Sequence, residues 1–547
     1  MAIEHLRNLA KFGVITDIDP YDLAPEAFSA GVNVRFRNGK VTGAPVFRNV
    51  LHLADANPRF AFAANPAQGL DYLFVGYEDG KVSLISGAAE FPYTPASYTS
   101  STVEATWSAT TLADVTYVNR SDRAPWALRS SDSKFVDIST VSYATAADKW
   151  DPTWSCKLLR TCGGALVAMN VQKGATVYPT MVKTSSIPLA DSIPVSWDHT
   201  TPSTLALENI LADMQGGIVD ACSLGSDLII YGQKQAFRMT PNGQLSEFNF
   251  TPLPFQKGAI NANCSVELDG TDIVFGPDDI WRHDGNSEKS ICDGRVRDFI
   301  YSSINMSKAS RCFVVHNPKL AEISFCYASG DGNTAFVGVG GCNRAAVWNY
   351  LNDTWSFDDL PSVYGGCTAN LSNPLTYDAC TATYDTMGGS YQDLEDGFKR
   401  TPCFVGDAQT SYGLVTSLYA QDPYGANSSV SYAVDTNATK PKYLARDGID
   451  LDELNVDLRG TKVLASIYPQ ARLGTGAAQL QINGGSGDGF NDPAVFVGWQ
   501  GYDGDTVTKC DFNTSGRFLS VQIRHDDYRE LVITGFDLEI RLTGKRG

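Results

Sequence analysis

A hairpin pattern that recurs along the chain at nearly constant spacing is the feature that most constrains the fold. The stretches 71–85, 226–240 and 271–284 each contain an Asp, three or four apolar residues, a Gly, a short turn and a second strand with large alternating side chains. The Asp residues of the second and third stretches lie 45 residues apart, and those of the first and second lie 156 apart, which is three steps of 52. The residues that define the pattern are Asp71, Gly76, Asp227, Gly232, Asp272, Gly276 and Trp281.

Three weaker copies of the same pattern, at 115–139, 163–186 and 321–361, lie between and after these hairpins. Steps of 45 to 52 residues match the four-stranded blade of a β-propeller, whose repeats are about 40–50 residues long. The last copy has Gly340-Gly341 followed by Tyr350 and Trp355, which is similar to a kelch blade. The spacing predicts an all-β chain with a propeller of about six blades, and stacked β-sandwiches are the alternative.

The length of the chain calls for more than one domain. A chain of 547 residues exceeds what a single core usually supports. Residues 59–361 are assigned to the propeller, and the Gly-, Ser- and Asn-rich stretch 362–400 to a long loop or insertion. Amphipathic strands resume in 401–547, which we assign to a C-terminal β-sandwich, and 1–58 form a separate N-terminal β-ribbon.

The ribbon itself can be derived from its residues. Apolar Val32, Val34 and Phe36 alternate with polar Asn33, Arg35 and Arg37. This period of two is that of a half-buried strand. Asn38-Gly39 then supplies the two positive-φ residues of a tight hairpin turn, and Lys40 begins the return strand.

Charge and cysteine usage exclude some classes of protein. The formal net charge of −18 opposes adhesive binding to nucleic acid, because that binding requires clustered Lys and Arg. The twelve cysteines contain no CxxC pair, which favours buried thiols in a reducing compartment over a disulfide framework. Neither a signal peptide nor an apolar stretch of transmembrane length is found, so we expect synthesis in the cytosol without membrane insertion.

The search for catalytic, metal and cofactor sites gives none. The six histidines are dispersed, and neither zinc spacing, a nucleophile elbow nor a P-loop occurs. His283 beside Asp284 is interpreted as a solvated residue of a turn. The carboxylate pairs Asp278-Asp279 and Asp358-Asp359 could serve glycoside hydrolysis, but we expect them in turns, where Asp caps the backbone.

Both ends of the chain resemble a known family. Residues 12–50 resemble the start of tail tubular or nozzle proteins of short-tailed bacteriophages. The matching residues are Asp17, Asp19-Pro20, Leu23, Pro25, Asn33-Val34-Arg35-Phe36 and Gly39, with Pro25 one residue late because residue 24 is Ala. Residues 515–547 resemble the end of these proteins through a Gly-Arg strand at Arg517, a Thr-Gly-Phe strand at Gly535-Phe536 and a basic tip.

The resemblance implies a structural virion protein. It implies a homohexamer in the virion tail, assembled in the host cytoplasm below the adaptor of the portal vertex, with tail fibres or a needle or plug protein as further partners. It also implies an outer propeller, a platform formed by the ribbon and the C-terminal domain, and a channel through which genomic DNA passes without specific binding. Arg35, Arg37 and Lys40 would then lie near a neighbouring subunit or the adaptor; the alternative is that the arginines only solvate an edge strand.

Two other functions remain open from the residues. A propeller could bind host-surface glycans through aromatic-lined loops, with Trp107, Trp126, Trp150 and Trp154 as candidates. A propeller glycosidase is the third possibility, although none of the expected catalytic motifs is present. We expect no enzymatic activity and no cofactor.

Overall fold

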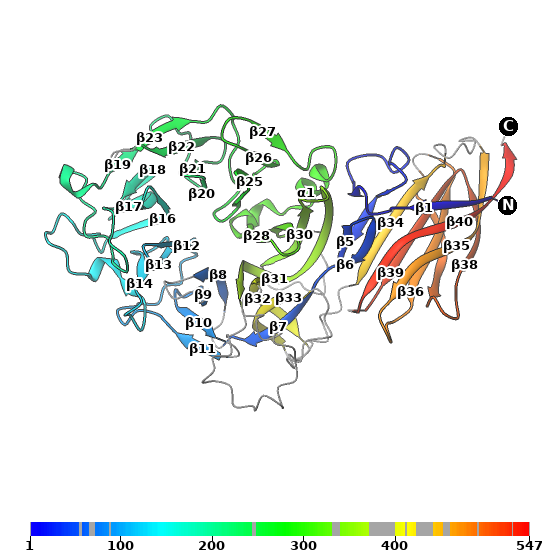
Figure 1. The fold of residues 1–547 in the computed structure, drawn as a ribbon, viewed down its shortest axis with the longest axis horizontal. Helices are drawn as coiled ribbons and strands as arrows, with labels where there is room; N and C mark the ends of the chain where they lie inside the picture. Colours follow the sequence, from blue (N-terminus) through cyan, green and yellow to red (C-terminus); the bar gives the residue numbers. More distant parts are fainter. Residues whose placement is uncertain are drawn as a thin grey trace.

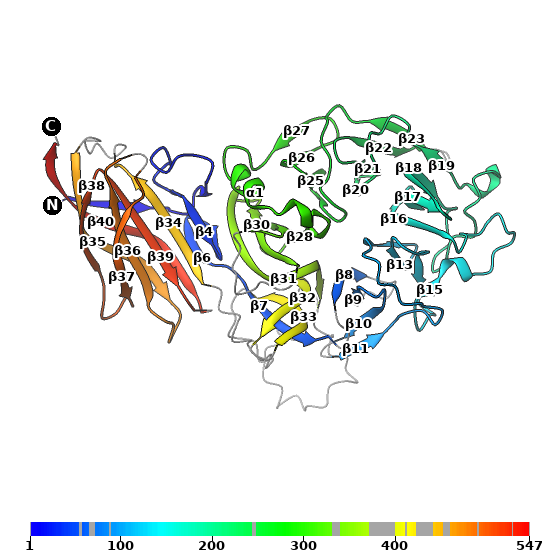
Figure 2. The same cartoon turned by 180° about the vertical axis from the view of Figure 1, so that it is seen from behind.

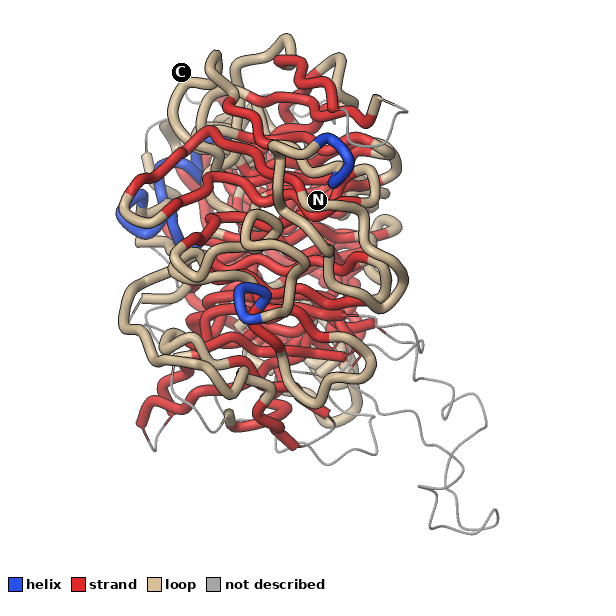
Figure 3. Tube along the Cα trace, turned by 90° about the vertical axis from the view of Figure 1, so that its left-hand side faces the viewer, coloured by secondary structure: helices blue, strands red, loops and turns tan. Residues whose placement is uncertain are grey.

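The computed structural model consists almost entirely of β-strands. It describes residues 2–53, 57–64, 72–86, 89–242, 248–330, 340–370, 400–410, 413–422, 441–451, 460–489, 492–527 and 529–545. Strands make up 56% of the structure and helices 4%, which confirms the all-β prediction (Figure 3). The helical segments in the described residues are α1 (Arg297–Ser303) and the short 3₁₀ turns η1 (Ile138–Thr140), η2 (Pro202–Thr204) and η3 (Met306–Arg311).

Five antiparallel four-stranded sheets follow one another along the chain. The first contains β8 (Pro58–Ala64), β9 (Tyr72–Tyr77), β10 (Val82–Ser86) and β11 (Ala89–Pro92). The second contains β12 (Trp107–Leu112), β13 (Val115–Arg120), β14 (Trp126–Leu128) and β15 (Val136–Asp137). The third contains β16 (Trp154–Cys162), β17 (Ala165–Lys173), β18 (Thr176–Thr184) and β19 (Glu208–Ile210). The fourth contains β20 (Asp220–Leu224), β21 (Asp227–Tyr231), β22 (Ala236–Pro241) and β23 (Phe248–Pro252), and the fifth contains β24 (Ser265–Leu268), β25 (Thr271–Phe275), β26 (Ile280–His283) and β27 (Glu288–Ser290).

Two further sets of four strands share one long strand. The sixth set is β28 (Phe313–Asn317), β29 (Glu322–Tyr327), β30 (Cys342–Asn349) and the first part of β31 (Thr354–Asn370). The second part of β31 pairs with β32 (Arg400–Thr410), which pairs with β33 (Gly413–Asp422), which pairs with β7 (Val46–His52). The seventh set therefore joins three segments that are far apart in the sequence.

The seven sets follow one another around a common centre (Figures 1 and 2). The first strand of each set contacts the first strand of the next, from β8 through β12, β16, β20 and β24 to β28. The circuit closes because β31 and β32 contact both β28 and β8. We call this part of the molecule the ring. The strands of all six predicted hairpins lie in it. The spacing predicts about six repeats, whereas the described residues form seven sets of four strands.

The remaining strands form a second β unit beside the ring. One layer has the order β38 (Cys510–Gly516), β35 (Gly460–Leu473), β40 (Leu531–Lys545), β6 (Lys40–Gly43) and β5 (Val34–Arg37), with β1 (Ala2–Arg7) also paired to β40. The other layer has β4 (Ala30–Val32), β34 (Lys442–Ile449), β39 (Phe518–His525), β36 (Leu480–Gly487) and β37 (Val495–Tyr502) in that order. β36 contacts both β38 and β35, and apolar side chains such as Leu464, Ile482 and Phe536 share one buried cluster. Both chain termini lie in this unit, on the side away from the ring (Figures 1 and 2).

The predicted boundaries near residue 400 differ from the pairing in the structure. Residues 362–370 and 400 belong to β31 and β32, so this part of the expected loop is strand, and 371–399 lie outside the described residues. The prediction places 401–422 in the C-terminal domain, but residues 401–410 and 413–422 pair within the ring. The reason is that a strand's partner is decided by non-local pairing, which the local pattern does not specify.

The ribbon turn forms as predicted, but the ribbon is more buried than expected. Arg37 pairs with Lys40 across the two-residue turn, where Asn38 and Gly39 have φ of 48° and 74°. Asn33, with φ of 57°, separates β4 from β5, so the predicted continuous strand is interrupted. The polar side of β5 is not solvated, because it faces the sixth set of the ring. Two short parallel strands, β2 (Gly13–Val14) and β3 (Ala27–Phe28), extend the same contact between ribbon and ring.

Candidate functional site at the ribbon junction

Arg35 joins the ribbon to the ring through a buried ionic network. Its Nη1 and Nη2 donate to the two carboxylate oxygens of Asp358 at 2.8 and 2.6 Å, and its Nε donates to Glu322 Oε1 at 2.9 Å. The three side chains are at most 3% exposed. Burial by itself lowers the pKa of Arg35, but Asp358 and Glu322 more than offset that effect, so the pKa lies above its ordinary value. Such a bidentate pair fixes orientation as well as charge.

Asn33 forms a second polar link one step along the ribbon. Its Nδ2 donates to Asp359 Oδ2 at 3.2 Å and to the Pro441 carbonyl at 2.9 Å, while its Oδ1 accepts from the Asp359 amide at 2.9 Å. Arg344 Nη2 lies 3.4 Å from the other oxygen of Asp359. An Asn tolerates the left-handed backbone found here, and its amide satisfies groups on the ring and on Pro441, the residue before β34.

These contacts correct the expectation for the ribbon's charged residues. Arg35 is buried and bonds within the chain, so the alternative that it only solvates an edge strand is wrong. Asp358 and Asp359 lie in strand β31, not in a turn, and both carboxylates are engaged. A buried carboxylate paired to Arg35 is not placed to act on a substrate.

Arg37 and Lys40 remain at the surface and line a pocket, which we call the basic pocket. Arg37 Nη2 donates to Glu322 Oε1 and to the Leu320 carbonyl, both at 2.5 Å. Lys40 is exposed at the tip of the ribbon. The pocket has a volume of about 270 Å³ and its charged lining consists of Arg35, Arg37, Lys40, Lys442, Arg472, Arg529 and Glu530.

The other residues of the family pattern have structural positions. Phe36 and Phe536 are buried in the core of the second unit. A Cβ on Gly39 would lie 2.4 Å from Asn8 Oδ1, and a Cβ on Gly535 would lie 2.5 Å from the Leu6 carbonyl oxygen, so both glycines allow close backbone packing. The Arg517 guanidinium lies 5.1 Å from the centre of the Phe518 ring.

The hairpin residues mostly serve the turns and the packing between sheets. The amides of Gly232 and Gly276 donate across their turns to Gln235 and Asp279 carbonyls at 2.8 and 2.9 Å. A Cβ on Gly76 would lie 3.2 Å from the ring of Trp107 in the next sheet. Trp281 and Trp355 are fully buried. The Asp227 carboxylate lies 3.7 Å from the Arg238 guanidinium, and Asp71 lies outside the described residues.

Asp272 and His283 form a buried chain of hydrogen bonds with Tyr231. The Tyr231 hydroxyl lies 2.6 Å from Asp272 Oδ2 and 2.7 Å from His283 Nε2. Because His283 Nδ1 accepts from the Gly285 amide at 3.0 Å, Nε2 carries the proton and donates to Tyr231, which donates to Asp272. Burial raises the pKa of Asp272 to about 7 and lowers that of His283 to about 4. The expectation of a solvated His283 was wrong, since the side chain is buried between sheets.

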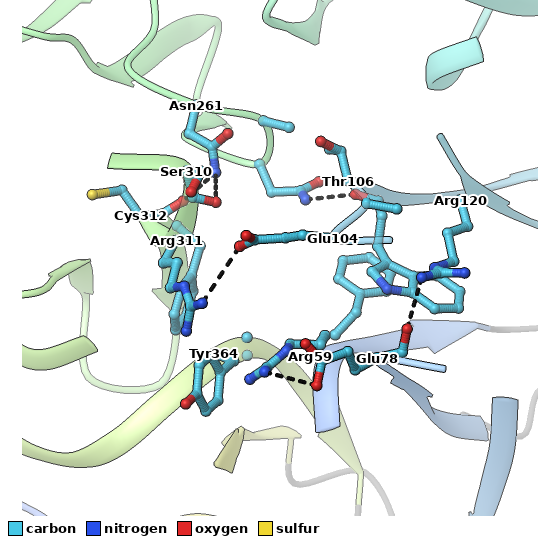
Figure 4. Close-up of a pocket in the computed structure, with 18 of the residues that line it drawn as sticks. Arg59, Glu78, Glu104, Thr106, Arg120, Asn261, Ser310, Arg311, Cys312 and Tyr364 are labelled. Carbon is cyan, nitrogen blue, oxygen red and sulfur yellow. Dashed lines mark hydrogen bonds and ion pairs between the residues drawn. The ribbon is translucent and has the colours of Figure 1, made fainter. Parts of the chain in front are cut away.

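Two cavities occupy the centre of the ring. The larger, about 800 Å³, is lined by the first strands of several sets and carries Arg160, Glu267 and Arg400 among its polar residues. The smaller, about 90 Å³, holds the ion pairs Arg59–Glu78 at 3.1 Å and Arg311–Glu104 at 3.5 Å (Figure 4).

Tyr364 ties the smaller cavity to the seventh set. Its ring lies 4.0 Å from the Arg59 guanidinium and 5.1 Å from that of Arg311, and its hydroxyl donates to Asp407 at 3.0 Å. Burial, and then Asp407, raise the pKa of Tyr364. These side chains come from the first set, the seventh set and the turn η3 before β28. Arg59, Arg311 and Tyr364 point toward one another, so the cluster stabilises the closure of the ring (Figure 4).

The tryptophans considered for glycan binding are mostly inside the sheets. Trp107, Trp126 and Trp150 are each at most 5% exposed. Trp154 is half-buried, with Lys173 Nζ 4.8 Å from its ring. A sugar ring stacks on an accessible aromatic face, which these three buried side chains do not offer.

Metal sites, disulfides and membrane spans were also sought in the described residues. These residues contain no group of three or more His, Cys, Asp or Glu side chains that could hold a metal ion. The eleven cysteines within them are free thiols, and most are buried. Among the helices that the structure describes, none has the length and apolarity needed to cross a membrane.

The comparisons with known proteins give weak likenesses only. No family model and no curated protein matches the chain. One similar solved structure is the computationally designed Ika8 protein, with a TM-score of 0.35 and 9% identity over 69% of this chain and 100% of that one. Another is PorZ, described as an essential bacterial surface component of the type-IX secretion system of Porphyromonas gingivalis, with a TM-score of 0.35 and 10% identity. That match covers 74% of this chain and 43% of PorZ, so the chain spans less than half of PorZ.

Proposed function

We propose that this protein is a structural component of a virion, the tail nozzle of a short-tailed bacteriophage. Six copies form a tube below the portal adaptor, and the genome leaves through it. In this proposal the ring of each copy is a seven-bladed β-propeller, and the second β unit is a sandwich that serves as the platform. The role requires no catalysis and no cofactor.

One observation carries the proposal: the two ends of the chain, which bear the family resemblance, are built into a single unit. β1 pairs with β40 from Ala2↔Ile540 to Arg7↔Gly535. β6 also pairs with β40, and β4 pairs with β34. A platform assembled from the ribbon and the C-terminal strands is the arrangement that the resemblance implies.

The link between platform and ring supports the same role. Subunits that form a tube need parts that do not rotate against one another. Asp358, Glu322 and Asp359 fix the ribbon to the ring through Arg35 and Asn33. A buried pair of this kind gives orientational specificity even where its net contribution to stability is small.

Particle symmetry is the direct test of this function. Purified protein would be examined by native mass spectrometry and negative-stain microscopy, alone and with the adaptor of the same virus. We expect a six-fold ring with a lumen in at least the second sample. A monomer in both samples would overturn the proposal, and specific retention on a glycan array together with a monomer would favour a receptor-binding role.

A further inference from the structure

The basic pocket stands out because the chain as a whole is acidic. Its lining has the side chains of Arg37, Lys40, Lys442, Arg472 and Arg529 against Glu530, whereas the whole chain has a net charge of −18. Arg472 pairs with Glu530 at 3.0 Å, Arg37 with Glu322 at 2.5 Å and Arg529 with Asp527 at 3.7 Å. Lys40 forms no such pair within the described residues, so positive charge remains in surplus around the cavity. Like charges held together at a surface favour an anionic partner.

Two donors in this pocket lack a partner within the part of the chain that the structure describes. The Nε of Arg37 is buried and has no hydrogen-bond acceptor there. Lys40 lies directly across the turn from Arg37 and forms no ion pair with any described residue. The Arg37 side chain is 26% exposed and Lys40 is exposed, so an acceptor supplied by another molecule can reach both side chains.

The complementary group is an acidic loop in the same ribbon, residues 16–26. Its Asp19 and Asp22 are exposed, and neither forms an ion pair within the described residues. The loop is held firmly, because Arg446 donates to the carbonyls of Pro20 at 2.6 Å and Leu23 at 2.8 Å. Its two free carboxylates are therefore presented in a fixed arrangement, which lowers the entropic cost of binding.

The loop and the basic pocket of one copy cannot meet. Strand β34 runs between them, with Lys442 in the pocket and Gly448 against Pro20 of the loop. Six residues of extended strand span about 20 Å, which is far beyond the reach of an Asp side chain. The carboxylates of the loop must therefore bind the pocket of another copy, if they bind it at all.

We propose that the basic pocket receives Asp19 and Asp22 of a second copy. The proposal rests on the proposed hexamer and specifies the contact between its neighbouring subunits. In the proposed hexamer each copy presents its loop to one neighbour and its pocket to the other, so the contact is heterologous. Such head-to-tail contacts generate closed rings when the rotation closes. Lys40 and Arg37 are the residues of the pocket that the incoming carboxylates pair with.

Charge reversal tests this contact. Lys40→Glu places a carboxylate in the pocket, and Asp19→Lys with Asp22→Lys reverses the loop. Lys149→Glu, an exposed lysine between the second and third sheets, is the matched control for net charge. Sedimentation velocity and native mass spectrometry, with the adaptor present where the wild type needs it, measure assembly, and circular dichroism checks folding.

We expect each reversal to weaken subunit association by at least about tenfold, because like charges then face each other. Lys149→Glu should assemble as the wild type does. The chain that carries both reversals, and an equal mixture of the two reversed chains, should regain assembly, since opposite charges meet again. Higher salt should weaken the wild-type contact.

Failure of this contact can be told apart from failure of the ring. If the wild type and both folded reversed chains form the same ring equally well, or the combined reversal does not restore assembly, the contact proposed here is wrong and the nozzle proposal stands. If the wild type stays monomeric under every condition, the proposed hexamer is wrong, and so is this contact between its subunits.

Discussion

Arg35 in the ribbon and Asp358 in β31 form a bidentate ion pair, with N–O distances of 2.8 and 2.6 Å, across 323 residues of sequence. Glu322 completes the network on the other side of the guanidinium at 2.9 Å. Because none of the three side chains is more than 3% exposed, each charge is stabilised by its partners and not by hydration.

Arg35→Met should therefore be strongly destabilising. It leaves Asp358 and Glu322 buried without their cation, which costs about 3–5 kcal/mol of unfolding free energy. Urea unfolding measures the loss. Adding Asp358→Leu should recover part of it, because one uncompensated charge is removed.

Arg541→Met is the matched control for this experiment. Arg541 is 54% exposed and lies 4.0 Å from Glu539, so loss of its charge should cost less than about 1 kcal/mol. Equal effects of the two Arg→Met changes would contradict the role assigned to the buried network.

Gly535→Val should detach β1 from β40. The new side chain would need the space of the Leu6 carbonyl oxygen, 2.5 Å from an ideal Cβ, and backbone cannot move aside as a flexible side chain can. Overpacking of this kind costs about 1–3 kcal/mol. Hydrogen exchange should show faster exchange of the amides of residues 2–7.

Gly330→Val provides the comparison, because the nearest atom to its Cβ, Ser303 O, is 4.0 Å away. Unchanged protection of residues 2–7 in the Gly535→Val chain would show that β1 does not depend on this close approach.

Asp272→Asn should change how stability depends on pH. The pKa of Asp272 is raised to about 7. This shift adds to the free energy of unfolding in full below about pH 4, and the contribution is lost as pH rises to 7. The pKa of His283 is lowered to about 4. This shift adds to the free energy of unfolding above about pH 6.5, and the contribution is lost as pH falls towards 4. These opposite trends largely cancel in the wild type.

The Asn variant retains only the His283 trend. Relative to the wild type it should therefore lose stability as pH falls from 7 to 4, by up to about 1.4 kcal/mol per pH unit. Urea midpoints at several pH values give the difference, with Asp505→Asn, an exposed Asp, as the control. A difference between wild type and Asp272→Asn that does not vary with pH would exclude this assignment.

Duplex DNA should bind the assembled protein weakly at all salt concentrations. With a net charge of −18, the protein supplies few Lys or Arg contacts whose counterion release would add affinity. Raising salt from about 50 to 200 mM should change little, in contrast to the 10³–10⁵-fold loss of a protein with 6–10 phosphate contacts. Filter binding provides the measurement, and tight retention at physiological salt would argue against a conduit of this charge.

The candidate site could be predicted in part. Arg35, Arg37 and Lys40 stand out in the sequence because they are the charged residues of the hairpin 31–45. The sequence does not show that Arg35 is buried while Lys40 is exposed, because the partners Glu322 and Asp358 come from strands 287 and 323 residues away from Arg35. A Glu at the start of the apolar strand 322–327 is the one local sign of a buried carboxylate.

The sequence alone determined the local β structure. The six hairpins and the Asn38-Gly39 turn depend on backbone preference and on a period of two, and these act between neighbouring residues. Tertiary structure decided which strands close the ring, since β7, β32 and β33 meet only after three separate segments pair. It also decided the burial of Arg35 and of the tryptophans, because a face that alternation marks as polar or accessible can still be covered by another sheet. Burial depends on contacts between distant segments, and the local pattern contains no information about them.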